Sequence, residues 1–143
     1  MDIFSPYIVA LIVAWLVAHI VKYAFALANG RQLDFTHQLF ISGGMPSSHA
    51  ATSVAVWAVV LCRDGVSSGL FGLATLVTLI ICYDAVKVRR SVGEQGAAIQ
   101  QIIKKQKLAV KLPRAAKGHT PVEVLAGSIL GAIIGVVVYI ATK

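Results

Sequence analysis

The chain has 143 residues, of which 57% are apolar and 13% are charged, and its formal net charge is +7 at pH 7. Helices of soluble proteins keep a polar face, but the segment Leu125 to Ile140 has no charged residue on any face. This pattern excludes an ordinary soluble helical protein. It indicates an all-α integral membrane protein instead.

Four apolar stretches, taken in chain order, predict four transmembrane helices. A membrane-spanning helix needs about 20 mostly apolar residues. The first and last stretches meet this length, and the two middle ones are near its lower limit. The predicted helices cover about 5–28, 46–62, 66–89 and 120–141, joined by long loops at about 29–45 and 90–119. We therefore expect residues 1–143 to form a single membrane domain.

A short amphipathic helix is predicted inside the second long loop. Between residues 93 and 107, Ile99, Ile102 and Ile103 recur at helical spacing, and Gln and Lys fill other positions. A helix with one apolar and one basic face lies in the membrane interface. We expect this segment on the inner leaflet.

The basic residues orient the chain in the membrane. Lys22 and Arg31 lie around the first long loop, and nine more lie between residue 87, at the end of the third predicted helix, and the start of the fourth. Short loops rich in Lys and Arg stay in the cytoplasm, so both long loops should be inside a bacterial-type plasma membrane and both termini outside. Anionic headgroups are a nearer partner for such loops than nucleic acid. The nine are Lys87, Arg89, Arg90, Lys104, Lys105, Lys107, Lys111, Arg114 and Lys117.

The second predicted helix begins with a candidate anion site. Pro46 suits the start of a helix, and Ser47, Ser48 and His49 then fall in the first turn. Free backbone N–H groups and the helix dipole favour an anion there. The alternative is a simple serine N-cap.

The fourth predicted helix begins with a second histidine. His119 precedes Glu123 by four residues, which is one turn, so the two side chains share a face. The carboxylate can accept the Nδ1–H of the imidazole and leave Nε2 with a free lone pair, as an attacking histidine needs. This pair predicts a nucleophile at the membrane surface.

Charged residues also close the third predicted helix. Asp84 lies near the end of an apolar stretch, where an acid needs a partner, and Lys87 is available at i,i+3. Arg89 and Arg90 follow. They either bind phosphate or only anchor the helix by snorkelling.

Small residues on the fourth predicted helix point to packing. Gly127, Gly131 and Gly135 form small-xxx-small steps that let another helix approach closely, so a homo-oligomer through this face is possible. His19, outside the loops, is expected to be a packed or interfacial residue, and His37 is either a plain loop residue or a neighbour of the site.

These motifs resemble the type 2 phosphatidic acid phosphatase superfamily, in its divergent, small, four-helix branch. The run from Gly44 to His49 is similar to its central Pro-Ser-Gly-His motif, and the run from His119 to Gly127 looks like its final motif. The resemblance implies phosphoester hydrolysis through a phosphohistidine, with no metal or cofactor. It implies that His119 attacks, Glu123 holds its tautomer, His49 protonates the leaving group, and Ser47 and Ser48 bind phosphate.

The arginines of the superfamily have no fixed counterpart here. Its first motif, Lys-x6-Arg-Pro, is absent, and Lys22 and Arg31 could stand in for it at a different spacing. Arg89, Arg90 or Arg114 could supply the usual motif arginine. Asp84 would orient such an arginine.

The predicted function is that of a membrane lipid phosphatase. Its substrate would be a lipid phosphate such as phosphatidic acid, phosphatidylglycerophosphate or a polyprenyl (di)phosphate. The alternative is a catalytically inactive phospholipid-binding or scaffold protein. Transport is less favoured, because four short helices leave little room for an internal pathway.

Overall fold

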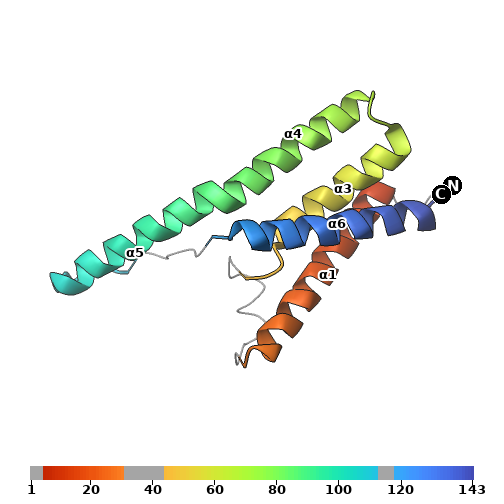
Figure 1. The fold of residues 1–143 in the computed structure, drawn as a ribbon. Helices are drawn as coiled ribbons and strands as arrows, with labels where there is room; N and C mark the ends of the chain where they lie inside the picture. The colour runs from red at the N-terminus through yellow and green to blue at the C-terminus, as the bar shows by residue number, and fades with distance from the viewer. Residues whose placement is uncertain (1–4, 31–43, 113–117) are drawn as a thin grey trace.

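The computed structural model describes residues 5–30, 44–112 and 118–143, and in these ranges the only regular structure is helical (Figure 1). An all-α membrane bundle was predicted, and the architecture confirms it. The elements are α1 (Pro6–Ala28), α3 (Ser48–Asp64), α4 (Gly69–Tyr83), the π-helical turn η1 (Asp84–Val88), α5 (Arg89–Lys105) and α6 (Pro121–Ala141).

Three helical segments of the described chain are long and apolar enough to cross a membrane. They are α1, the continuous segment Gly69–Lys105, and α6. The remaining helix, α3, has 17 residues and packs against α1, α4 and α6. Its buried face is made mostly of alanine and valine, which lets the neighbouring backbones come close.

The ends of the helices are joined by two specific hydrogen bonds. At one end, the Tyr7 hydroxyl donates to Asp64 Oδ2 at 2.7 Å and ties the start of α1 to the end of α3. At the other end, the Ser47 N–H donates to the Glu123 carbonyl oxygen at 3.0 Å. This second bond brings together the starts of α3 and α6, the two helix starts that carry the sequence motifs.

The third predicted helix is longer than the sequence suggested. We expected it to end near residue 89, but α4, η1 and α5 form one unbroken rod that ends at Lys105 and extends past the rest of the bundle (Figure 1). The amphipathic segment is therefore a continuation of this rod and is not separated from it by a loop. No proline interrupts residues 84–105, and the π turn absorbs the local change of register without ending the helix.

The glycine face of α6 is used within the chain. A Cβ at Gly127, Gly131 or Gly135 would collide with the carbonyl oxygen of Ser47, Ala51 or Ala55, all on the α3 side. These glycines therefore let α6 lie against α3. The face on which an oligomer was predicted is therefore covered by α3 of the same chain.

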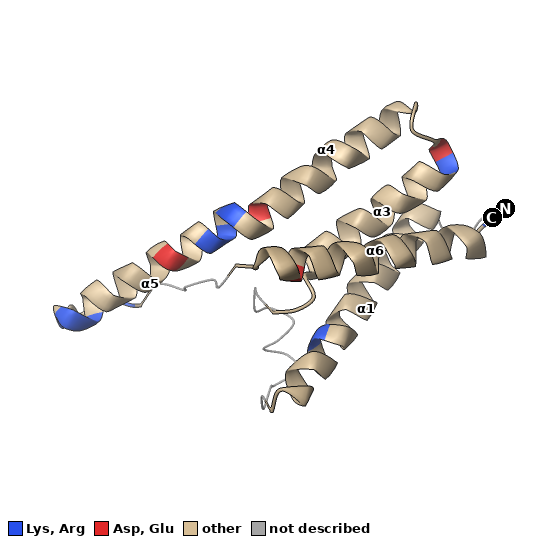
Figure 2. Ribbon diagram, in the orientation of Figure 1, with Lys and Arg blue, Asp and Glu red and all other residues tan. Residues whose placement is uncertain are grey.

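The outer surface of the bundle is apolar. Large side chains on α4 and α6 are more than half exposed, among them Leu73, Leu79, Leu125 and Ile133. Figure 2 shows α4 free of charged residues along its length, with Lys and Arg gathered farther along the same rod. An exposed apolar band of this extent matches a lipid-facing surface.

Candidate active site

His119 is held at the entrance to α6 by the residues that cap the helix. Its side chain is only 3% exposed, and its Nδ1 lies 3.1 Å from Glu123 Oε2. The same oxygen accepts the Thr120 N–H at 3.0 Å, and the Thr120 hydroxyl accepts the Glu123 N–H at 3.3 Å. This capping box fixes the carboxylate, so the predicted contact between His119 and Glu123 is present.

The chain just before α6 is also attached to the long rod. The His119 N–H donates to the Ala85 carbonyl oxygen at 3.2 Å. Gly118 has φ +59°, and a Cβ there would lie 2.6 Å from the backbone N and Cα of Arg90. Sequence reasoning missed Gly118 and Ala85, although a glycine directly before the histidine was a usable signal. Their contacts bring His119 to the arginines that follow η1.

The two arginines have different partners. Asp84 Oδ2 accepts from Arg89 Nε at 2.6 Å, whereas Glu94 Oε1 accepts from Arg90 Nε at 3.1 Å. The predicted pairing of Asp84 with Lys87 is therefore wrong. In a π turn residues five apart share a face, which selects Arg89 as the partner. The Arg89 charge acts on both His49 and His119.

Lys22 lies inside the bundle with its charge near the histidines. It is 6% exposed, and its charge interacts with Glu123, His119 and His49. Its aliphatic carbons lie 4.0 Å from where a Cβ at Gly44 would be. A buried lysine on a membrane helix needs such polar neighbours. Lys22 is thus brought from α1 to the two histidines.

At the start of α3, Ser47 caps the helix and His49 lines a cavity. Ser47 is fully buried, and its hydroxyl accepts the Ala50 N–H at 3.4 Å as an N-cap. The cap alternative thus accounts for this hydroxyl. Ser48 and His49 line a cavity between α1, α3 and α4. His49 is the exposed member of the motif.

Burial sets the ionisation of His119. It lowers the pKa of the imidazole below its usual value, and the hydrogen bond to Glu123, which raises the pKa, only partly offsets this. The positive charges of Lys22 and Arg89 lower it further. At neutral pH the ring is therefore neutral, as a nitrogen nucleophile must be.

The sequence also singled out four other residues. Arg31, His37 and Arg114 lie outside the described residues. His19 donates from Nδ1 to the Trp15 carbonyl oxygen at 2.8 Å, and the two rings are in contact, with centroids 4.4 Å apart. These contacts attach it to its own helix, as expected for a packed or interfacial histidine, and its charge also acts on His49.

The arrangement defines a helical membrane protein with two histidines, a carboxylate and two cations gathered at one end of the bundle. The Divergent PAP2 family model matches residues 4–134, and the chain belongs to this family. The chain is also similar to the uncharacterized membrane protein YuiD of Bacillus subtilis (strain 168). The two are 30% identical over 135 residues, which cover 84% of this chain and 85% of the relative. No solved structure matches the chain.

Proposed function

We propose that the protein is a membrane lipid phosphatase that hydrolyses a lipid phosphomonoester or diphosphate through a phosphohistidine on His119. Family membership supports a relationship to phosphatases. The observation that carries the proposal is the buried His119, neutral by burial and bonded through Nδ1 to Glu123. Among the described residues Nε2 has no hydrogen-bond partner, so it is the nitrogen available for attack.

The proposed reaction has two steps. In the first, His119 Nε2 attacks phosphorus, an N–P bond forms, and the bond from phosphorus to the leaving oxygen breaks. His49 donates a proton to that oxygen, which leaves as part of the neutral alcohol, or as part of the lipid monophosphate when the terminal phosphorus of a diphosphate is attacked. In the second step, His49 accepts a proton from water, the oxygen of that water attacks phosphorus, and the N–P bond breaks to release phosphate and free His119.

The cations of the site would stabilise the charge on the transferring phosphoryl group. Lys22 and Arg89 both interact electrostatically with the two histidines. Neutralisation by such fixed cations is the main electrostatic requirement of phosphoryl transfer. Arg89 is the better candidate of the two arginines, because Asp84 holds it near the histidines while Arg90 is engaged by Glu94.

The site is proposed to face the cytoplasm. It lies at the end of the bundle from which α5, with Lys104 and Lys105 in its last turn, extends. Basic segments next to apolar helices resist translocation. Substrates would then be lipid phosphates of the inner leaflet, whose anionic headgroups attract the same lysines.

Phosphate release tests this proposal directly. The purified full-length protein in detergent should release phosphate from a member of a panel of lipid phosphates and diphosphates, and His119→Ala should stop the release. His49→Ala should slow substrates with poor leaving groups more than those with good ones. Lys143→Ala, beyond the end of α6 that lies away from His119, is the control and should keep activity.

Two results would count against the mechanism. Continued turnover by His119→Ala would show that the reaction does not pass through a phosphohistidine on His119. Binding of lipid phosphates with no release from any panel member would instead support a phospholipid-binding protein without catalysis.

A further inference from the structure

A cavity of about 340 Å³ opens beside His49 between α1, α3 and α4. Along α3 it is lined from His49 to Val56, a span of roughly 10 Å at the helical rise. Trp15 of α1 and Val77 of α4 also line it. The cavity therefore leads from one of the site histidines towards the middle of the bundle.

Hydroxyl side chains in the wall of this cavity already donate to the backbone. Thr52 donates to the Ser48 carbonyl oxygen at 2.7 Å, Ser53 to that of Ala50 at 3.2 Å, and Thr78 to that of Ser53 at 3.3 Å. Much of the remaining lining is aliphatic or aromatic. Such a wall has few free donors for the oxygens of a ligand, and it suits a hydrocarbon chain.

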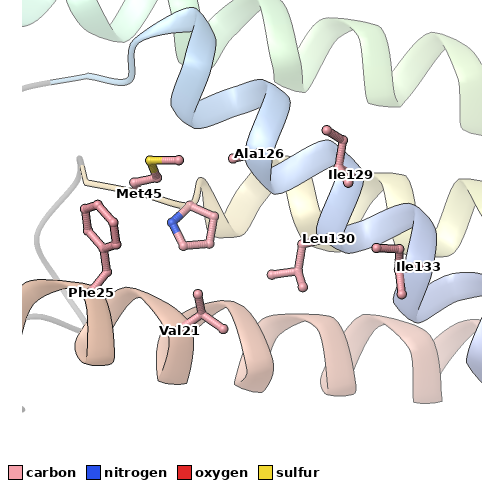
Figure 3. A pocket seen from close by; sticks show the side chains of 8 residues that line it. Val21, Phe25, Met45, Ala126, Ile129, Leu130 and Ile133 are labelled. Carbon is pink, nitrogen blue, oxygen red and sulfur yellow. The ribbon is translucent and has the colours of Figure 1, made fainter. Parts of the chain in front are cut away.

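A second cavity, of about 380 Å³, lies between α1 and α6 (Figure 3). Its lining is apolar, with Val21 and Phe25 on α1, Met45 and Pro46 before α3, and residues of α6. Neither His49 nor His119 lines it. A hydrocarbon chain bound in this second cavity would not bring the leaving oxygen of its alcohol next to His49, the proposed acid.

We propose that the cavity beside His49 binds the hydrocarbon chain of the leaving alcohol, and that the substrates are phosphates of single-chain alcohols, of the polyprenyl or long-chain alkyl type. This rests on the proposed function, in which His49 protonates the leaving oxygen. The carbons attached to that oxygen must then lie at the mouth of this cavity. In a diacylglycerol phosphate, the carbons next to the leaving oxygen carry two ester groups and two chains. The ester oxygens would be buried without hydrogen-bond donors, because the hydroxyls of the cavity wall already donate to the backbone.

Substrate preference is the first test. With the purified full-length protein in detergent, kcat/KM for a polyprenyl phosphate should exceed that for dioleoyl phosphatidic acid by about tenfold or more. Val77→Trp, which fills the cavity from α4, should lower kcat/KM for the polyprenyl phosphate about tenfold but leave butyl phosphate unaffected. Leu76→Trp, at the next position and outside the cavity lining, is the matched control. Equal or better hydrolysis of phosphatidic acid would overturn the single-chain assignment.

A binding measurement separates this inference from the proposed function. The chain has two tryptophans, so Trp57→Phe leaves Trp15 as the reporter inside the cavity. A long-chain alkyl phosphate with a brominated chain should quench Trp15 in a saturable way. Val77→Phe should remove the saturable part and Leu76→Phe should keep it.

The two outcomes have different meanings. Without saturable quenching, the cavity is not the chain site, whatever the protein hydrolyses. If quenching is saturable but the protein releases phosphate from no substrate, the cavity does bind the hydrocarbon chain and the proposed phosphatase function is wrong.

Discussion

The His119 N–H donates a hydrogen bond to the carbonyl oxygen of Ala85, 3.2 Å away. Ala85 is inside η1, where the Arg89 N–H bonds to the Asp84 carbonyl oxygen, five residues earlier. The proposed nucleophile is thus attached through its own backbone to the π turn that precedes Arg89. π turns of this kind are frequent at functional sites.

Gly118→Ala should damage the site through the backbone. A Cβ would meet Arg90 at 2.6 Å, and φ is +59°, so the chain before His119 must move away from the rod. We expect phosphate release to fall about tenfold or more and the free energy of unfolding to fall by about 1–3 kcal/mol. Gly30→Ala has a similar φ of +68° with nothing within 4 Å. This control should lose stability only, and equal loss of activity in both variants would contradict the role of the Gly118 contact.

Asp84→Asn should impair catalysis more than folding. The variant weakens the hold on Arg89, so kcat/KM should fall about tenfold, or about 1.4 kcal/mol. Both side chains are more than a third exposed, and an ion pair with that much solvent contributes little to stability. Thermal unfolding in detergent should therefore be nearly unchanged. Glu94→Gln breaks the corresponding pair with Arg90 and should leave kcat/KM unchanged. A larger loss of kcat/KM in Glu94→Gln than in Asp84→Asn would indicate that Arg90, and not Arg89, binds the phosphoryl group.

The pH dependence of kcat/KM should show the lowered pKa of His119. Because burial favours the neutral ring, attack by His119 should persist below the usual histidine pKa of 6.5 and be lost only as the pH falls further. In Glu123→Gln the hydrogen bond and charge that raise this pKa are weakened, so the acidic limb should move to still lower pH. The maximum rate should fall about tenfold or more, because the tautomer is no longer held. If kcat/KM instead falls at a pH above 6.5, and that pH is the same in Glu123→Gln, His119 is not the titrating group.

Gly131→Ala should separate α6 from α3. The added methyl group would collide with the Ala51 carbonyl oxygen, and overpacking of this kind costs about 1–3 kcal/mol. The loss should appear as a lower thermal midpoint, with no change of oligomeric state by size-exclusion chromatography. Gly72→Ala, on α4 with nothing within 4 Å, should be neutral or slightly stabilising, since alanine is the better helix former. A shift of oligomeric state in Gly131→Ala alone would reassign the glycine face to an interface between copies.

Cysteine labelling in intact cells should show which side the site faces. In a background without Cys62 and Cys82, single cysteines at Ser67 and Gln101 both occupy exposed positions, in the α3–α4 turn and on α5. A membrane-impermeant thiol reagent should label the first and not the second if α5 is cytoplasmic. Lysed cells provide the control, in which both should label. Labelling of Gln101 in intact cells would place the site outside.

Several features were predictable from sequence because they depend on residues close together in the chain. The apolar runs predicted the membrane helices, and the spacing of His119 and Glu123 predicted a contact within one helical turn. The serine cap of α3 was recognised as an alternative for the same reason. Hydrophobic runs, caps and i,i+4 pairs follow from local geometry.

Tertiary structure decided which distant residues meet. Asp84 pairs with Arg89 because a π turn changes the register, and a period of 3.6 residues does not reveal such a turn. The glycines of α6 face α3 of the same chain, although small-xxx-small spacing equally suits a second copy. Likewise, the approach of Lys22 to the histidines depends on how α1 packs against its neighbours. Sequence periodicity identifies which face of a helix packs closely, but the partner of that face is set by the lowest free energy of the whole bundle.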